Sequence, residues 1–215
     1  MTPTDPDTEA IEHRLAAGRE LDVEPSWRRL TDALVQRAAA EDLLDVAVER
    51  HESPFGALML AATREGVVRL GFPDEADGFL DELARLVSGR VMRAPRPSLA
   101  AARHQLDQYF DRGRTRFDVP LDWRLTRGFR REVLTVTSAI PYGRTLSYAE
   151  VAACAGSPRA WRAAGTALAT NPLPILVPCH RVLRGSGQIG PYRGGTEVKR
   201  RLLSLEAGGT ADQGA

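Results

Sequence analysis

The feature that most constrains the fold of this chain is a pair of short, sharply bounded helical segments between residues 147 and 170. The stretch "SYAE" (147–150) has the form of a capping box, in which the Ser147 side chain caps the start of a helix and Glu150 reaches back to it. We expect this helix to end near Gly156, in an Ala-Gly-Ser turn. Two helices joined by so short a turn are typical of a helix-turn-helix.

The second of these helices has its own boundary signals. Ser157 is the expected N-cap, and Pro158 stands at the first helical position, where no backbone N–H is needed. At the far end Asn171 is expected in the left-handed conformation of a C-cap residue, and Pro172 prevents the helix from continuing. The sequence therefore predicts a helix over residues 158–170 that stops abruptly.

The two sides of the 158–170 helix differ in character. The face expected to be buried consists of Trp161, Ala164, Gly165 and Leu168. The opposite face carries Arg159, Arg162, Thr166 and Ala169. A narrow face of small side chains with two arginines suits a helix that enters a DNA groove. It equally suits a packed helix with two solvated arginines, and the pattern alone leaves both interpretations open.

The first half of the chain has the pattern of an α+β domain. Residues 44–72 alternate apolar and polar side chains around two turns, which predicts a β-meander of about three strands and a small antiparallel sheet. Segments 78–89 and 98–113 are expected to be helices, and 115–123 a strand followed by a linker. An apolar stripe predicts a further helix over 125–140.

These elements divide the chain into four segments. Residues 1–41 are expected to be a polar N-terminal extension with one short helix, and residues 42–122 the small α+β domain. Residues 123–207 are expected to form a mostly helical, winged-helix-like domain that contains the helix-turn-helix, and residues 208–215 a flexible tail. A chain of 215 residues is long enough to bury a core in such an arrangement.

Charge is distributed unevenly along the chain. The formal net charge is +1, but residues 1–122 carry a net charge of −7 and residues 123–206 a net charge of +9. A basic half of this size favours a polyanionic partner, and nucleic acid first. The alternative is a solvated surface in an arginine-rich chain, in which 28 of the 29 basic residues are arginine and only Lys199 is lysine.

The composition argues against several other functional classes. The two cysteines are too few for a disulfide framework and form no C-x-x-C pair, and the four histidines are scattered, so we expect neither a metal site nor a cofactor. No apolar run approaches the about 18 residues that span a bilayer. The polar, acidic start of the chain is unlike a signal peptide, and we therefore expect a cytoplasmic protein without membrane contact.

A cysteine and a histidine stand side by side after the apolar run "LPILV" (173–177), which places Cys179 at the edge of the core. An inert packing thiol is the ordinary interpretation of a cysteine, and the one we adopt for Cys154. The neighbours of Cys179 favour a nucleophilic thiol instead. His180 offers a base and Arg181 a positive charge, and either one nearby turns a thiol into a nucleophile. His180 reaches Cys179, directly or through a water, only if the segment is helical or tightly turned there.

A histidine base usually needs a third group that fixes its tautomer. The helix expected over 196–206 offers one, in Glu206 at its end. The expected buried stripe of this helix is Val198, Leu202 and Leu205, whereas Lys199, Leu203 and Glu206 share another face. Glu206 is therefore either partly buried against His180 or solvated, as most glutamates are.

These residues carry a resemblance to a known family. The segment "NPLPILVPCHRVLRGSGQIGPYRGG" (171–195), followed by "VKRRLLSLE" (198–206), resembles the active-site segment of the O6-alkylguanine-DNA alkyltransferases, also called methylated-DNA–protein-cysteine methyltransferases. The match runs nearly continuously from Phe129 to Glu206 and includes "IPYGRTLSYAEVA" and "GSPRAWRAAGTALATNP". Residues 42–122 resemble the smaller α+β domain of the family more loosely.

The resemblance implies a function. Family members flip an alkylated guanine out of the duplex, which exposes an atom that base stacking hides. A pocket cysteine, here Cys179, attacks the O6-alkyl carbon by in-line displacement, and each molecule reacts once because the thioether is permanent. The implied partner is double-stranded DNA that contains O6-alkylguanine or, less well, O4-alkylthymine. A monomer without a cofactor is implied, with cooperative binding along DNA left open.

The resemblance also implies catalytic roles. His180 would deprotonate Cys179 through a bound water, and Glu206 would orient His180. Asn171 would link the recognition helix to the active-site turn by hydrogen bonds. Lys199 matches a family lysine near the site.

Further roles concern DNA and the pocket. Arg162 would fill the gap that the flipped base leaves, and Tyr148 would press on the adjacent phosphate and donate a proton towards the guanine ring. The rest of the implied DNA face consists of Arg159, Thr166 and Ala169, and the implied pocket residues are Pro174, Val182, Tyr192 and Arg193. Backbone groups of Cys179 and Val182 would read the guanine edge.

Two departures from the family pattern stand out. Arg193 occupies the place of a small hydroxyl residue near O6 in some relatives, so it either narrows the pocket or points to the phosphates. Ala169 replaces a basic residue.

The alternative function is a DNA-binding alkylation sensor without repair activity, but such binders lack the reactive cysteine that Cys179 supplies. A Cys-His hydrolase would need an oxyanion hole and would leave the basic helix-turn-helix without a role.

Overall fold

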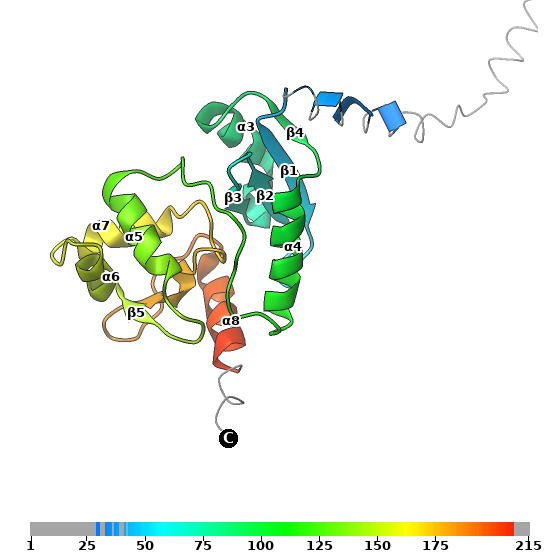
Figure 1. Ribbon diagram of the computed structural model, residues 1–215. Helices are drawn as coiled ribbons and strands as arrows, with labels where there is room; N and C mark the ends of the chain where they lie inside the picture. Colours follow the sequence, from blue (N-terminus) through cyan, green and yellow to red (C-terminus); the bar gives the residue numbers. More distant parts are fainter. Residues whose placement is uncertain (1–28, 31–32, 36, 39–40, 42, 209–215) are drawn as a thin grey trace, which may run out of the picture. The chain divides into compact units, whose positions relative to one another are not determined.

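The computed structural model of the protein (Figure 1) forms two compact units, Met1–Leu43 and Leu44–Ala215. The residues that it describes are 29–30, 33–35, 37–38, 41 and 43–208. Those at 29–30, 33–35 and 37–38 are helical, in agreement with the helix predicted in the N-terminal extension. The other features predicted for residues 1–24 and 209–215 lie outside the described residues.

The sheet of the second unit begins with the predicted meander, β1 (Val46–His51), β2 (Leu58–Ala62) and β3 (Val67–Gly71), in antiparallel pairing. A fourth strand, β4 (Val91–Arg93), pairs parallel with β1 and gives the order β3-β2-β1-β4. The sheet is therefore mixed, and the prediction of a purely antiparallel one is wrong. Three residues are too few to show the alternation that identifies a strand in sequence.

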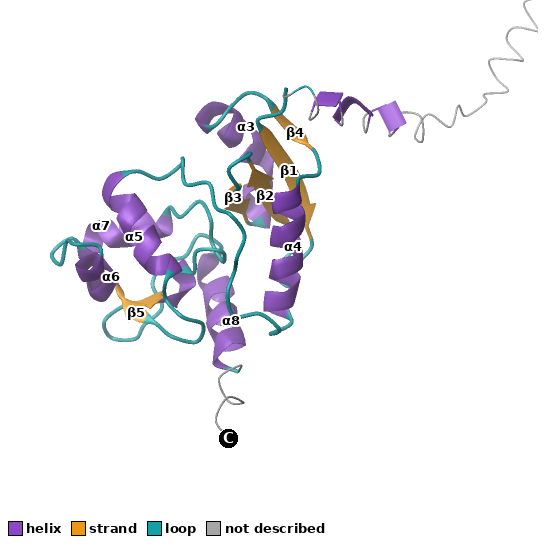
Figure 2. Ribbon diagram, viewed as in Figure 1, coloured by secondary structure: helices purple, strands orange, loops and turns teal. Residues whose placement is uncertain are grey.

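Both faces of this sheet are covered. All residues of β2 and β3 are buried, and because successive side chains of a strand point to opposite faces, neither face is open to solvent. Helix α3 (Ala76–Leu86) places Phe79 and Leu83 in the core on one side, and α4 (Pro97–Phe110) packs against β1, β2 and β3 (Figure 2).

Two predictions in this half need correction. Helix α3 ends at Leu86 and not at Gly89, and the Val87 and Ser88 N–H groups both bond to the Leu83 carbonyl in its last turn. The segment 115–123 is not a strand, apart from a single bridge between Leu121 and Val67. Its backbone instead bonds at that one point to the edge of β3, through Val67 N–H and the Pro120 carbonyl.

The second half is mostly helical, as predicted. Its elements are α5 (Gly128–Ser138), β5 (Leu146–Ser147), α6 (Tyr148–Cys154), α7 (Trp161–Ala169), β6 (Val182–Leu183) and α8 (Gly195–Ala207). The predicted capping box is present, because Ser147 Oγ accepts from the Glu150 N–H at 3.2 Å and the Glu150 carboxylate accepts from the Ser147 N–H at 2.6 Å. Helices α5, α6 and α7 pack against one another, and β5 pairs with β6.

The start of the second short helix was predicted wrongly. Helix α7 begins at Trp161, and residues 157–160 form a turn closed by the Ala160 N–H and the Ser157 carbonyl, so Ser157 and Pro158 do not begin the helix. Ala164 and Leu168 are buried as expected, but Trp161 is 47% exposed because it lies on the first turn, at the end of the helix. Cys154, expected in the core, is exposed at the end of α6.

The loop that leads into α8 approaches the α+β half closely at Gly194. A Cβ added there would lie 2.6 Å from the Phe72 ring, whereas one added at Gly185 meets nothing within 4 Å. We expect Gly194→Ala to lower the free energy of unfolding by about 1–3 kcal/mol through overpacking. Gly185→Ala should stay within about 0.5 kcal/mol of the wild type. Urea denaturation measures both, and equal stabilities of the two variants would contradict this packing.

Candidate active site

The end of α7 is tied to the following chain by Asn171, which is completely buried. Its Oδ1 accepts from the Leu173 N–H at 3.0 Å, and its Nδ2 donates to the Val177 carbonyl at 3.0 Å and to Cys179 Sγ at 3.1 Å. Asn171 is not in the left-handed conformation that its position predicted. One side chain thus joins the helix end, the apolar run and the thiol.

The apolar run brings the thiol inside the protein. Residues 173–177 are all buried, and Cys179 is only 3% exposed, so it lies deeper than the edge of the core. Residues Cys179–Arg181 form a 3-10 turn. The tight turn that the sequence required for His180 to serve Cys179 is therefore present.

A buried pair of side chains follows the thiol. His180 Nε2 lies 2.9 Å from Glu206 Oε1 of α8, and both residues are at most 1% exposed. The interpretation of Glu206 as a solvated helix-end residue is wrong. Because a carboxylate only accepts hydrogen bonds, it fixes the imidazole proton on Nε2. His180 Nδ1 is buried without a partner among the described residues, and it keeps a free lone pair.

Glu206 is held by more than His180. The Arg181 guanidinium donates to both carboxylate oxygens at 2.9 Å, the Tyr109 hydroxyl donates to Oε1 at 2.6 Å, and the Gly143 N–H donates to Oε2 at 3.1 Å. Burial opposes ionisation of Glu206, but the hydrogen bonds from His180 and Arg181 outweigh it and lower the pKa to about 2. Arg181, expected beside the thiol, is the counterion of this carboxylate.

The resting thiol and imidazole are both neutral. Burial raises the pKa of Cys179 to about 11, against the opposing effects of the Asn171 hydrogen bond and the Lys199 charge. Burial also lowers the pKa of His180, against the hydrogen bond from Glu206. The site therefore stores no thiolate at neutral pH, and the neutral base follows the neutral nucleophile in the same 3-10 turn.

Helix α8 buries charged residues where apolar ones were expected. Lys199 is 1% exposed, whereas Val198 and Leu205 of the predicted stripe are only half-buried and Leu202 alone is fully buried. Lys199 Nζ donates to the Val182 carbonyl at 2.6 Å. Burial lowers the pKa of Lys199 to about 8, against the opposing charge of a Cys179 thiolate.

Tyr192 and Pro174 are both buried. The Tyr192 ring stands edge-on to the His180 ring at 6.4 Å, and its hydroxyl has no partner among the described residues.

Arg193 is paired with the α+β half. Its Nε lies 2.5 Å from Glu75 Oε1, beside Glu82 and the buried Arg69. Its positive charge is also among the effects that oppose the burial-driven rise in the pKa of Cys179.

A hollow of about 710 Å³ lies over α7, between the start of α6 and the loop 184–191. Its lining includes Tyr148, Arg162, Thr166 and Ala169 but not Arg159. The Arg162 guanidinium stacks at 4.5 Å on the exposed Trp161 ring. Cys179 does not line the hollow, whereas Tyr148 does, and a Cys179 charge adds to burial in raising the pKa of Tyr148.

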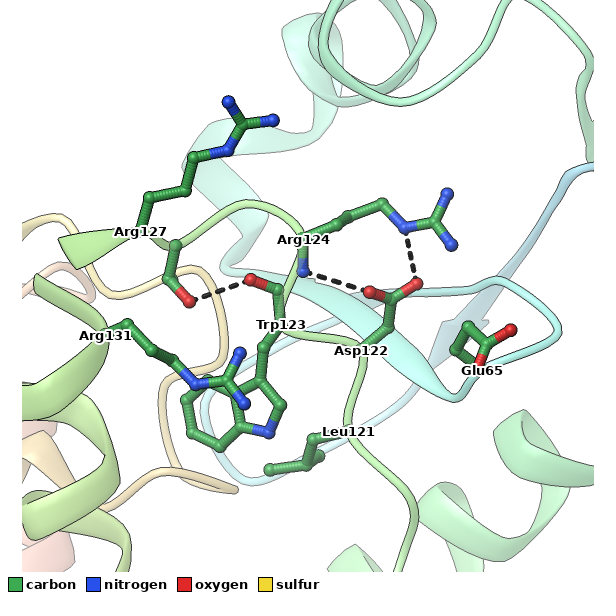
Figure 3. A pocket seen from close by; sticks show the side chains of 8 residues that line it. Glu65, Leu121, Asp122, Trp123, Arg124, Arg127 and Arg131 are labelled. Carbon is green, nitrogen blue, oxygen red and sulfur yellow. Dashed lines mark hydrogen bonds and ion pairs between the residues drawn. The ribbon is translucent and has the colours of Figure 1, made fainter.

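A second hollow, of about 430 Å³, lies around Trp123 (Figure 3). Arg131 stacks on the indole at 4.4 Å, and Arg124 pairs with Asp122 at 2.6 Å. It contains none of the residues predicted for the site. In the described part of the chain, no three His, Cys, Asp or Glu side chains gather to hold a metal ion, and no helix is long and apolar enough to cross a bilayer.

Comparison with known families agrees with this arrangement. Residues 48–123 match the model of the 6-O-methylguanine DNA methyltransferase, ribonuclease-like domain, and residues 128–208 match the model of the 6-O-methylguanine DNA methyltransferase, DNA binding domain. The chain belongs to the 6-O-methylguanine DNA methyltransferase family. The resemblance noted in the sequence is confirmed, and so is the succession of an α+β half and a helical half.

Two members of the 6-O-methylguanine DNA methyltransferase family illustrate the similarity. The constitutive methylated-DNA–protein-cysteine methyltransferase of Bacillus subtilis is 38% identical over 156 residues, which cover 72% of this chain and 92% of that protein. The crystal structure of Mycobacterium tuberculosis OGT in complex with DNA is 35% identical with a TM-score of 0.63, and the match covers 76% of this chain and 93% of that one.

Sequence patterns missed Tyr109 and the role of Arg181 in the site described above. Tyr109 lies on α4 in the α+β half, and nothing in the sequence around it indicates that its hydroxyl belongs to the site. Arg181 was noticed beside the thiol, but its partner is 25 positions away. A buried carboxylate is costly unless a cation pairs with it. The burial of Glu206 is therefore the one signal that points to Arg181.

The buried carboxylate predicts a pH-dependent stability. The pKa of Glu206 is about 2 in the folded protein and near its ordinary value of 4.5 when unfolded, so its contribution is complete above pH 4.5 and is lost as the pH falls to about 2. We expect Glu206→Gln to lower the free energy of unfolding by roughly 3 kcal/mol at neutral pH. The difference from the wild type should shrink in acid.

Urea denaturation at neutral pH and near pH 3 measures this difference. Glu197→Gln is the control, because Glu197 lies on the same helix, is exposed and pairs with the exposed Arg200. The control should change little at either pH. A Glu206→Gln deficit that stays constant across the two pH values would contradict the folded-state pKa.

Proposed function

We propose that this protein repairs DNA by transferring an alkyl group from O6-alkylguanine in the duplex, and less well from O4-alkylthymine, to its own Cys179. The observation that carries the proposal is the Cys179–His180–Glu206 geometry. The buried thiol and His180 belong to one 3-10 turn, and the imidazole has its Nε2 held by a carboxylate and its Nδ1 free. Family membership supplies the reaction class that suits such a thiol.

The proposed chemistry needs one proton path and one displacement. The Cys179 thiol gives its proton, through a water, to His180 Nδ1. The sulfur electron pair then forms a bond to the alkyl carbon, and the bond from that carbon to O6 breaks. Its electron pair returns to the guanine, which takes up a proton from the Tyr148 hydroxyl. The thioether stays on Cys179, so each molecule reacts once.

The neighbours of Cys179 support formation of the thiolate at the moment of reaction. The Asn171 amide bonds to Sγ, and the positive charge of Lys199 lies close enough to favour the thiolate. Both effects oppose the desolvation that keeps the resting thiol neutral. In this proposal a thiol with a pKa of about 11 reacts because its base, its hydrogen-bond donor and its countercharge are already in place.

The DNA face is proposed to be the exposed side of α7. The hollow over this helix is lined by Arg162, Thr166 and Ala169, and by Tyr148 at the start of α6. A helix-turn-helix made by α6 and α7 would place these side chains at the duplex, and a flipped base would pass Tyr148 on the way to the thiol. The Mycobacterium tuberculosis structure in complex with DNA supports DNA as the partner.

Replacement of the thiol tests the chemistry. Cys179→Ala should abolish methyl transfer from O6-methylguanine DNA and leave duplex binding measurable, because Cys179 lines none of the exposed hollow. Mass spectrometry after incubation with such DNA should find one added methyl group on the wild-type peptide that contains Cys179. Cys154→Ala is the matched control, because this thiol is exposed on α6 and should not be needed. A wild-type protein without the adduct on Cys179 would refute the proposal.

Removal of the proposed arginine finger separates flipping from binding. Arg162→Ala should slow repair of a duplex by at least about tenfold while weakening duplex affinity much less, since the guanidinium would fill the space of the flipped base. Single-turnover rates and binding titrations measure the two effects. Arg159→Ala, outside the hollow, should change mainly affinity and its salt dependence. Equal losses of rate and affinity in Arg162→Ala would contradict a finger role.

A further inference from the structure

Tyr109 is a buried hydroxyl that no step of the proposed reaction uses. It lies near the end of α4, in the α+β half, and is 0% exposed. Its ring is wedged among aromatic neighbours, with centroids at 5.2 Å from Phe117, 5.6 Å from Phe110 and 6.0 Å from Tyr142. The packing of the ring therefore directs the hydroxyl towards α8.

The hydroxyl meets the histidine and its carboxylate at the same point. It donates to Glu206 Oε1 at 2.6 Å, and its oxygen lies 3.4 Å from His180 Nε2. Since its proton goes to the carboxylate, the phenol oxygen presents a lone pair to the Nε2–H. The imidazole proton thus faces two acceptors, Glu206 Oε1 and the Tyr109 oxygen, and both hold it on Nε2.

We propose that Tyr109 is a positioning residue of the alkyl-transfer site, which holds Glu206 and His180 so that Nδ1 stays unprotonated and directed to the thiol. This inference rests on the proposed function. The α+β half then contributes directly to the reaction centre, through a side chain 71 positions before His180. The helical half alone would have an incomplete relay.

The hydroxyl acts as a permanent neutral donor. Burial first, and the Glu206 charge second, raise the pKa of Tyr109 far above its ordinary value, so it keeps its proton at every relevant pH. Its hydrogen bond withdraws negative charge from Glu206. The titratable and charged groups around His180 are Glu206, Arg181, Lys199, Tyr109 and Tyr192, and Cys179 precedes it in the same turn.

Loss of the hydroxyl has a defined electrostatic consequence. Without it, Glu206 presents more negative charge to the imidazole, which favours the imidazolium and raises the pKa of His180. A larger share of His180 is then protonated at a given pH and unable to accept the thiol proton. The rate should fall, and its loss on acidification should begin at higher pH.

The test compares Tyr109→Phe with Tyr142→Phe. The first keeps the ring and removes the hydroxyl, and the second removes a neighbouring hydroxyl that donates to the Leu205 carbonyl, at 3.3 Å. We expect the single-turnover methyl-transfer rate of Tyr109→Phe to fall about fivefold, the factor of one ordinary hydrogen bond. Its acid limb should move to higher pH, while Tyr142→Phe keeps the wild-type profile.

A double-mutant cycle shows whether the hydroxyl acts through Glu206. In a Glu206→Gln background, Tyr109→Phe should change the rate much less than in the wild type, because the carboxylate on which it acts is gone. An equal effect in both backgrounds would overturn the proposal. So would a Tyr109→Phe variant with an unchanged rate and an unchanged acid limb.

Two further measurements keep this inference separate from the proposed function. The pH profile of Cys179 alkylation by iodoacetamide, in a Cys154→Ser background, probes the relay without DNA and should shift in the same direction. It therefore remains informative if no methyl transfer occurs. If Tyr109→Phe fails to fold, NMR of the unaltered protein decides: the Tyr109 hydroxyl proton should give a slowly exchanging, downfield signal, and a rapidly exchanging hydroxyl would overturn the proposal.

Discussion

The buried carboxylate of Glu206 is the interaction on which the rest of the site depends. A charge taken out of water is costly unless donors surround it, and here four donors come from three parts of the chain. Arg181 follows the thiol, Tyr109 lies on α4, Gly143 lies in the turn after α5, and His180 is the base itself. The position of each of these segments is therefore fixed relative to α8.

This arrangement explains how a buried thiol can be both inert at rest and ready to react. Because Arg181 already neutralises Glu206, the carboxylate orients His180 without making it a cation, and burial keeps Cys179 protonated. Cys154, by contrast, is exposed at the end of α6. Of the two thiols, Cys179 is the one that lies in the turn that carries His180.

Local signals in the sequence were sufficient for part of this structure. The capping box at Ser147 and Glu150, the meander of β1 to β3 and the helix that carries Glu206 were predicted from spacings of a few residues. The family resemblance supplied Asn171 and Lys199 as site residues. Their contacts in the structure are consistent with those roles, which stay proposals.

Other features depend on distant partners or on competing turns, which spacing does not reveal. Tyr109 and Glu206 are 97 positions apart, and Arg193 and Glu75 are 118 apart. Strand β4 is too short to alternate, and its place beside β1 is set by tertiary packing. Pro158 was expected at the first helical position, because no backbone N–H is needed there. In the structure the chain makes a separate turn before the helix begins at Trp161.

The central claim is that a neutral His180 holds its proton on Nε2 and keeps Nδ1 free for the thiol. Nitrogen-15 NMR of the labelled imidazole at neutral pH measures this directly, because protonated and unprotonated ring nitrogens have well-separated chemical shifts. The account predicts a protonated Nε2 and an unprotonated Nδ1. A proton on Nδ1, whether as the other tautomer or as an imidazolium, would contradict it.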